Sequence, residues 1–335
     1  MNRLLRRALL GIALGALLYA GALVAVDASR LRESLADYRW SALGAALLLS
    51  TGNYALRFVK WELCLGWLGI REPGEGNAPG LTRRRSALIY AAGLSMSVTP
   101  GKLGEVLRSL LLRSSDGVSG SRTAPIVIAD RLTDLIALVV LSLLGIARFR
   151  EYLPVVGAAL ALVVAAVLGL GSPRVLRAAL RGVGRLGLQA VAIRAERLVG
   201  SSSLLLRLRP LALLTALSLV GWGLECLGYY CVLRGFPAAE PGLLLCAFLW
   251  SATTLIGALS FLPGGLGATE GSLAVLAGRL VPGVGAPTAL ASTLLVRAAT
   301  LWYAVLLGGV ALALFLRDPV LRAASRRLDA GSLVD

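Results

Sequence analysis

The stretch TPGKLGE at residues 99–105 returns in a related form, LPGGLGATE, at residues 262–270. Each copy places Pro-Gly-x-Leu-Gly at the end of an apolar segment and follows it with a glutamate. Because Pro and Gly break helices, each copy predicts a turn between two helical arms. The alternative is an ordinary turn between helices in a chain that is rich in Leu and Gly.

The residues that follow the two turns indicate an internal repeat. Glu105 lies 26 residues before Arg131, and Glu270 lies 27 residues before Arg297. Both arginines lie in apolar surroundings, where a charge is unusual. The two halves of the chain are therefore predicted to place a Glu and an Arg in equivalent positions.

Long apolar segments surround these motifs. The 335-residue chain is 57% hydrophobic and has a mean hydropathy of +0.79, which exceeds what one soluble core requires. A bilayer crossing needs roughly 20 apolar residues. Uncharged runs approach or exceed that length at residues 8–26, 152–173, 210–224, 241–269 and 298–316. Several such runs exclude a single signal peptide as their explanation and predict an all-α, polytopic membrane protein.

The arginines predict the orientation of these segments. Arg3, Arg6 and Arg7 precede the first apolar run, so the N-terminus is expected in the cytoplasm. Residues 27–40 are expected to form a charge-balanced external loop, and residues 174–209 a cytoplasmic loop rich in arginine. That loop is either an amphipathic helix on the membrane surface or a solvated basic segment. The arginines after residue 316 place the C-terminus in the cytoplasm as well.

We therefore expect about six spanning helices and two re-entrant helical hairpins, near residues 86–113 and 241–280. Such broken helices are tolerated at membrane depth where protein or a water-filled cavity covers them. Because an odd number of crossings separates the hairpins, residues 1–150 and 151–335 are predicted to form an inverted repeat.

Composition excludes several classes of function. The net charge of +16 resides largely in arginines between apolar segments, without an aromatic-rich basic surface for nucleic acid. The chain has no His, which excludes imidazole catalysis and His-ligated metals. Its four cysteines, Cys64, Cys226, Cys231 and Cys246, lie inside apolar runs. They are expected to be buried thiols, and we expect no metal, no disulfide and no cofactor.

Ionisable residues at membrane depth and the two turns define a candidate site. Helices that begin after the turns point backbone N–H groups toward a shared cavity, which favours an anion such as phosphate. Lys102, Arg131 and Arg297 would add charge-assisted hydrogen bonds, while Glu105 and Glu270 would hold the cations when the ligand is absent or would titrate. The alternative is that these charges only pin helices together. The predicted substrate-binding residues are Thr99, Pro100, Gly101, Lys102, Gly104, Glu105, Arg108, Asp130, Arg131, Asp134, Pro263, Gly264, Gly265, Gly267, Glu270 and Arg297.

The same segments resemble a known family. TPGKLGEVLRSLLL at residues 99–112, ADRLTD at 129–134, FLPGGLGATEG at 261–271 and Arg297 with Trp302 are similar to the lysylphosphatidylglycerol synthase transmembrane-domain family, also called the flippase-like domain family. The resemblance covers nearly the whole chain, although the family often has Glu where this chain has Asp130.

The resemblance implies a membrane domain associated with flipping aminoacylated phospholipids or with processing hopanoids and polyprenyl-linked sugars. Full-length synthases of the family continue into an aminoacyl-transferase domain, which is not expected here.

The sequence thus predicts an inner-membrane flippase or translocase for an anionic lipid or a lipid-linked phosphate, and no enzyme. The alternatives are a membrane enzyme that uses Glu105 and Glu270 as acid and base, or an accessory subunit in lipid biosynthesis. The bilayer and the lipid are the expected partners, with no nucleic acid. A homo-oligomer or a partner from lipid biosynthesis is left open.

Overall fold

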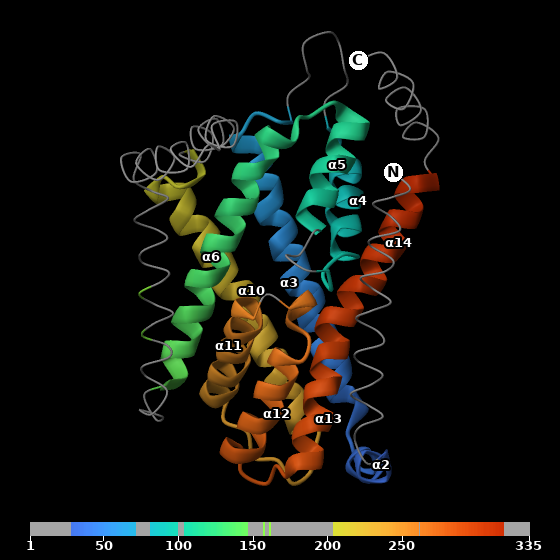
Figure 1. Ribbon diagram of the computed structural model, residues 1–335, viewed down its shortest axis with the longest axis vertical. Helices are drawn as coiled ribbons and strands as arrows, with labels where there is room; N and C mark the ends of the chain where they lie inside the picture. The colour runs from blue at the N-terminus through green and yellow to red at the C-terminus, as the bar shows by residue number, and fades with distance from the viewer. Residues whose placement is uncertain are drawn as a thin grey trace, which may run out of the picture.

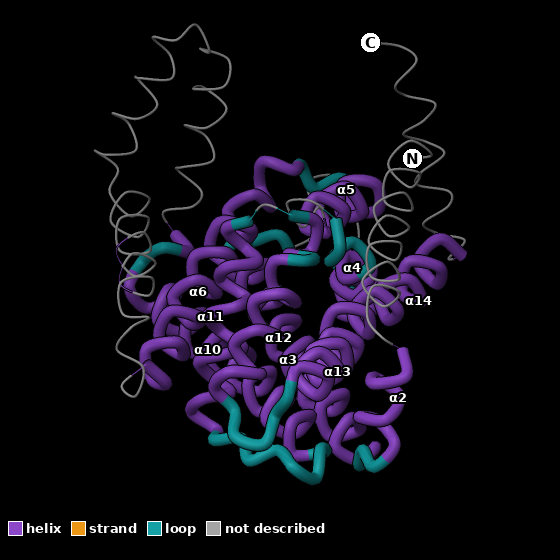
Figure 2. The backbone as a smooth tube through the Cα atoms, turned by 60° about the horizontal axis from the view of Figure 1, so that its bottom comes forward, coloured by secondary structure: helices purple, strands orange, loops and turns teal. Residues whose placement is uncertain are grey.

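Figure 1 shows the protein in a computed structural model, as a bundle of helices packed along one long axis. The structure describes residues 28–71, 81–99, 104–146, 204–260 and 262–317, together with Gly157 and Ala161. In these ranges the backbone is helical, and its loops gather mainly toward the two ends of the bundle (Figure 2). The predicted crossing at 8–26, the apolar run at 152–173 and most of the basic loop lie outside the described residues.

The first half of the chain forms five described helices. They are α2 (Ala28–Ala36), α3 (Trp40–Trp67), α4 (Arg83–Leu94), α5 (Gly104–Asp116) and α6 (Gly120–Ile146). Thr82 caps α4, since its hydroxyl accepts a hydrogen bond from the backbone N–H of Arg85 at 3.3 Å. The expected loop at 27–40 is in large part the helix α2.

The second half follows a similar order. A turn of 3-10 helix, Pro263–Gly265, separates the two arms of its hairpin, and a π-helical turn, Ala298–Trp302, joins its last two helices. The helices are α10 (Leu208–Arg234), α11 (Leu243–Leu259), α12 (Ala268–Leu280), α13 (Ala286–Arg297) and α14 (Tyr303–Arg317).

Three helical segments are long and apolar enough to cross a membrane among the residues described: 40–67, 208–234 and 286–317. The protein is therefore an all-helical, multi-pass membrane protein. The predicted number of crossings, the re-entrant character of the hairpins and the inverted repeat stay predictions at this point.

Helix α6 begins well before its apolar run. Only residues 132–147 are apolar enough to suggest a crossing, yet α6 starts at Gly120 and includes Asp130, Arg131 and Asp134. With 27 residues it is about 40 Å long. The helix tolerates these charges because each of them has a partner of opposite charge inside the bundle.

The two hairpins enter the bundle from opposite ends (Figure 1). The pair α4–α5 extends from the end at which α3 finishes, and α11–α12 extends from the end at which α10 finishes. Their turns meet inside the bundle, where Val98, Leu266 and Leu301 form a buried cluster. At Gly264, with φ of 59°, a Cβ would lie only 3.1 Å from Val98 Cα, so the backbones of the two turns touch.

Each hairpin closes on a glycine contact. Gly93 of α4 and Gly104 of α5 approach so closely that neither leaves room for a Cβ on the other. In the second hairpin Gly257 packs directly on Thr269 and Gly265 in the same way. Small residues of this kind let helix backbones pack closely in a membrane protein.

The two halves of the chain are interleaved. Helix α3 packs along α10, α6 packs against α11, and α14 packs against α4. The result is two apolar cores at opposite ends of the bundle. One core includes Trp61, Tyr90 and Phe315, and the other includes Tyr229 and Trp250.

The two ends differ in charge. At the end where α3 and α14 finish, which we call the Arg-rich end, the residues with described side chains include nine arginines and two carboxylates. At the other end the residues with described side chains include four arginines and three carboxylates. The first group is Arg71, Arg83, Arg84, Arg85, Arg113, Arg122, Arg207, Arg209 and Arg317 with Glu62 and Asp116, and the second is Arg32, Arg39, Arg234 and Arg279 with Glu33, Asp37 and Glu240.

Candidate functional site

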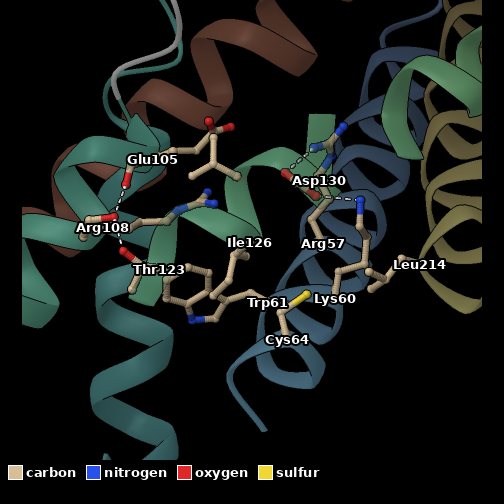
Figure 3. Close-up of a pocket in the computed structure, with 12 residues that line it drawn as sticks. Arg57, Lys60, Trp61, Cys64, Glu105, Arg108, Thr123, Ile126, Asp130 and Leu214 are labelled. Atoms are coloured by element: carbon tan, nitrogen blue, oxygen red, sulfur yellow. Dashed lines mark hydrogen bonds and ion pairs between the residues drawn. The ribbon is translucent and has the colours of Figure 1, made fainter. Parts of the chain in front are cut away.

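A small cavity lies between α3, α5, α6 and α10. Figure 3 shows that charged side chains from α3 and α6 lie on one side of it, while Glu105 and Arg108 of α5 lie on another. Apolar side chains and the hydroxyls of Ser109 and Thr123 complete the lining. The full set is Arg57, Lys60, Trp61, Cys64, Glu105, Arg108, Ser109, Thr123, Ile126, Val127, Asp130 and Leu214.

Two cations of α3 face two carboxylates of α6 beside the cavity. Lys60 Nζ lies 2.6 Å from Asp130 Oδ1 and 3.2 Å from Asp134 Oδ1, and Arg57 Nη2 lies 2.7 Å from Asp134 Oδ2. Lys60 also donates to Ser218 Oγ at 2.7 Å. The Lys60 side chain is only 3% exposed, so both its charge and its hydrogen bonds are satisfied by protein.

The same network continues into the second half of the chain. Arg57 Nε donates to Asn53 Oδ1 at 3.3 Å, and the amide of Asn53 donates to Glu225 of α10. Trp250 Nε1 of α11 donates to the other oxygen of Glu225 at 3.2 Å. A continuous polar layer therefore links α3, α6, α10 and α11.

Arg108 occupies a different environment. Its guanidinium lies 4.0 Å from the ring centroid of Tyr90 and 5.8 Å from that of Trp61, and its Nε donates to the Tyr90 carbonyl at 3.2 Å. Gly93 lies directly beneath its side chain, because a Cβ there would collide with Arg108 Nε and Cγ. Among the described residues Arg108 has no carboxylate partner within ion-pair distance.

The two Glu and Arg residues of the repeat form ion pairs. Arg131 of α6 bonds Glu105 of α5, and Arg297 of α13 bonds Glu270 of α12, with Nε 2.6 Å from Oε1. Each arginine therefore ties the return arm of a hairpin to the long helix that follows it.

The second pair also holds its turn. Arg297 Nη2 donates to the Gly264 carbonyl at 2.8 Å, and Glu270 Oε2 accepts the backbone N–H of Gly267 at 2.7 Å. These bonds satisfy backbone groups that a broken helix would otherwise leave without partners.

The structure distributes the predicted site residues over two places. Glu105, Arg108 and Asp130 line the cavity, and Arg131 and Asp134 pair with residues around it. Glu270 and Arg297 lie at the second turn, with Pro263, Gly264, Gly265 and Gly267, and not in the lining of this cavity. Thr99 is buried at the end of the first turn and Gly104 begins α5, while Pro100, Gly101 and Lys102 lie outside the described residues.

Sequence reasoning missed Arg57 and Lys60 as site residues. The signal was present, since Arg57 and Lys60 are three residues apart on one helix, and Asp130 and Asp134 are four residues apart on another. Such spacings place side chains on one face of each helix, so the two faces could have been matched by charge.

Metal binding finds no support in the described part of the chain, which has no group of three or more Cys, Asp and Glu that could hold an ion. The four cysteines are free thiols. Cys64 is buried beside the cavity and is not part of a ligand set.

Replacing Lys60 by Met should destabilise the protein by about 3–5 kcal/mol, because it leaves Asp130 and Asp134 with one cation fewer in a buried layer. The double variant Lys60→Met with Asp130→Asn should recover part of this loss. The loss of helix content during unfolding in detergent measures the stability of each variant. The exposed Arg279→Gln is the control, because it also removes one positive charge. Equal stability of Lys60→Met and Arg279→Gln would contradict the role of this layer.

Comparison with known proteins places the chain in a family. A family model described as "Lysylphosphatidylglycerol synthase TM region" matches residues 8–308. A comparison with curated proteins gave no match. The matched region contains both turns, both Glu–Arg pairs and the cavity. The chain therefore belongs to the lysylphosphatidylglycerol synthase TM region family, as its motifs predicted.

Proposed function

We propose that this protein moves an anionic lipid, or a lipid-linked phosphate, between the leaflets of its membrane. The family supports a lipid-related function in the bilayer. The observation that carries the proposal is the meeting of two oppositely directed turns inside the bundle, at Val98 and Gly264. Transporters with broken helices commonly bind substrate where such elements meet near the membrane midplane.

In this proposal the two hairpins are re-entrant and belong to an inverted repeat. The order α3, α4–α5, α6 corresponds to α10, α11–α12, α13–α14, and equivalent helices run in opposite directions along the bundle (Figure 1). The ion pairs Glu105–Arg131 and Glu270–Arg297 then occupy equivalent places beside the two turns. The shared polar layer and the contact between the turns support this assignment.

The ion pairs give the transport cycle a physical basis. An arginine at membrane depth is costly without an anionic partner. Glu105 and Glu270 supply it when the lipid is absent, and a phosphate that passes between the turns competes with them for the arginines. No chemical change of the lipid is required.

Glu270→Gln should reduce lipid movement roughly tenfold or more, since without the competing carboxylate Arg297 holds the phosphate instead of releasing it. The glutamine keeps an oxygen for the Gly267 N–H, so the turn should remain folded. Glu105→Gln should behave in the same way. Lipid movement is measured in proteoliposomes by the accessibility of a labelled lipid in the outer leaflet.

The exposed Glu240→Gln is the matched control and should transport like the unaltered protein. Mass spectrometry of the lipids after the assay separates the alternatives, because a modified lipid would show a membrane enzyme. Absence of both movement and modification would indicate an accessory subunit. Normal transport by folded Glu105→Gln and Glu270→Gln would contradict the proposed path.

We also propose that the Arg-rich end faces the cytoplasm of an inner membrane, with both termini on that side. Among the residues with described side chains, nine arginines and two carboxylates lie at that end, and four arginines and three carboxylates lie at the other. This distribution follows the rule that positive charge stays inside. Arg84→Cys and Glu240→Cys, each in a background without the four native cysteines, should react with an impermeant thiol reagent from opposite sides. Terminal reporters should give a cytoplasmic signal, and labelling of Glu240→Cys from the cytoplasm would overturn this orientation.

A further inference from the structure

We infer that Arg108 binds the singly charged phosphodiester of a membrane lipid in the cavity beside α5. The choice of a lipid as the ligand rests on the proposed function, whereas the anion site itself follows from the charges around the cavity. Three observations lead to Arg108: the balance of charge, the way the guanidinium is held, and the apolar surface next to it.

The charges on the α3 and α6 side of the cavity balance one another. Arg57 and Lys60 contribute two positive charges, and Asp130 and Asp134 contribute two negative charges. The three shortest contacts between these cations and carboxylates measure 2.6–3.2 Å. Replacing these contacts by a ligand would leave buried carboxylates without their cations. The α3 and α6 side of the cavity is therefore not expected to bind an incoming anion.

The α5 side of the cavity has one positive charge in excess. Glu105 is paired with Arg131, which leaves Arg108 as the cation of the lining that no described carboxylate neutralises. A ligand with a single negative charge restores neutrality in a medium where an uncompensated charge is costly. A phosphodiester carries one such charge.

The guanidinium of Arg108 is held in place, and its terminal nitrogens remain available to a ligand. The rings of Tyr90 and Trp61 and the Tyr90 carbonyl fix the guanidinium through its face and its Nε. Its terminal nitrogens make no hydrogen bond to any described residue. Two N–H groups side by side match two phosphate oxygens, so the fixed guanidinium is prepared for this ligand.

The surroundings favour a lipid over a soluble phosphate. Val106 and Leu110, on either side of Arg108 in α5, are 49% and 37% exposed, and in a bilayer such side chains face acyl chains. The cavity itself includes Trp61, Ile126 and Leu214. A headgroup on Arg108 can therefore keep its acyl chains on apolar surface.

Native mass spectrometry of the full chain in detergent tests this site. The protein is offered dioleoylphosphatidylglycerol or dioleoylglycerol, which share acyl chains and differ in the phosphoglycerol headgroup. The unaltered chain should retain the phospholipid in preference to the diacylglycerol. Arg108→Gln should weaken phospholipid binding roughly tenfold, the expected scale for one charge-assisted contact, whereas Arg113→Gln should have little effect. Arg113 is exposed and lies on the same helix.

The controls separate the outcomes. Equal retention of both lipids by the unaltered chain would overturn the inference without any variant, so a misfolded Arg108→Gln cannot obscure the result. Equal loss of binding in Arg108→Gln and Arg113→Gln would do the same. Release of the phospholipid by excess inorganic phosphate would contradict a lipid ligand and indicate a soluble anion.

Binding and transport can also fail separately. If phospholipid binding depends on Arg108 but proteoliposomes move no lipid, the Arg108 site stands and the proposed transport fails. If proteoliposomes move lipid but phospholipid binding does not depend on Arg108, the proposed transport stands and the Arg108 site is wrong.

Discussion

The pairing of Arg57 and Lys60 with Asp130 and Asp134 is the interaction on which the rest of the structure depends. These four charges lie between the two apolar cores of the bundle, so α3 and α6 cannot slide or rotate without exposing a charge to hydrocarbon. Ser218 and, through Asn53, Glu225 join α10 to the same layer. The register of the three long helices is thereby fixed, and the broken segments pack against a rigid frame.

That frame explains why two interrupted hairpins can exist inside the bundle. Such turns carry backbone groups that a bilayer cannot satisfy, and protein satisfies those described in the second turn. Arg297 bonds the Gly264 carbonyl, Glu270 bonds the Gly267 N–H, and the two turns contact each other at Val98. The place where the helices are broken is thus also the place where polar groups and both halves of the chain converge.

Much of this arrangement could be predicted because its signals are local. Pro-Gly motifs marked both turns, and the nearly equal spacing from Glu to Arg singled out the residues of two ion pairs that the structure contains. The start of α6 could not be found from hydropathy, since Asp130 and Asp134 look unsuitable for a crossing until Arg57 and Lys60 are placed opposite them. The role of Arg108 depends on Tyr90, Trp61 and Gly93, which approach it only in the folded chain. Helix α2 was missed because its segment is short, polar and charge-balanced.

If a lipid passes where the two turns meet, a reversible cross-link between the turns should block lipid movement. Measuring transport before and after this cross-link forms tests the proposed function most directly. Val98 and Leu266 belong to one buried cluster but to different hairpins. Val98→Cys with Leu266→Cys, in a background without the native cysteines, should form an oxidative cross-link that stops lipid movement in proteoliposomes. Reduction should restore movement, and either single variant should remain active under oxidation. Full transport by the cross-linked protein, or a transport-competent protein in which the two thiols never join, would contradict this path.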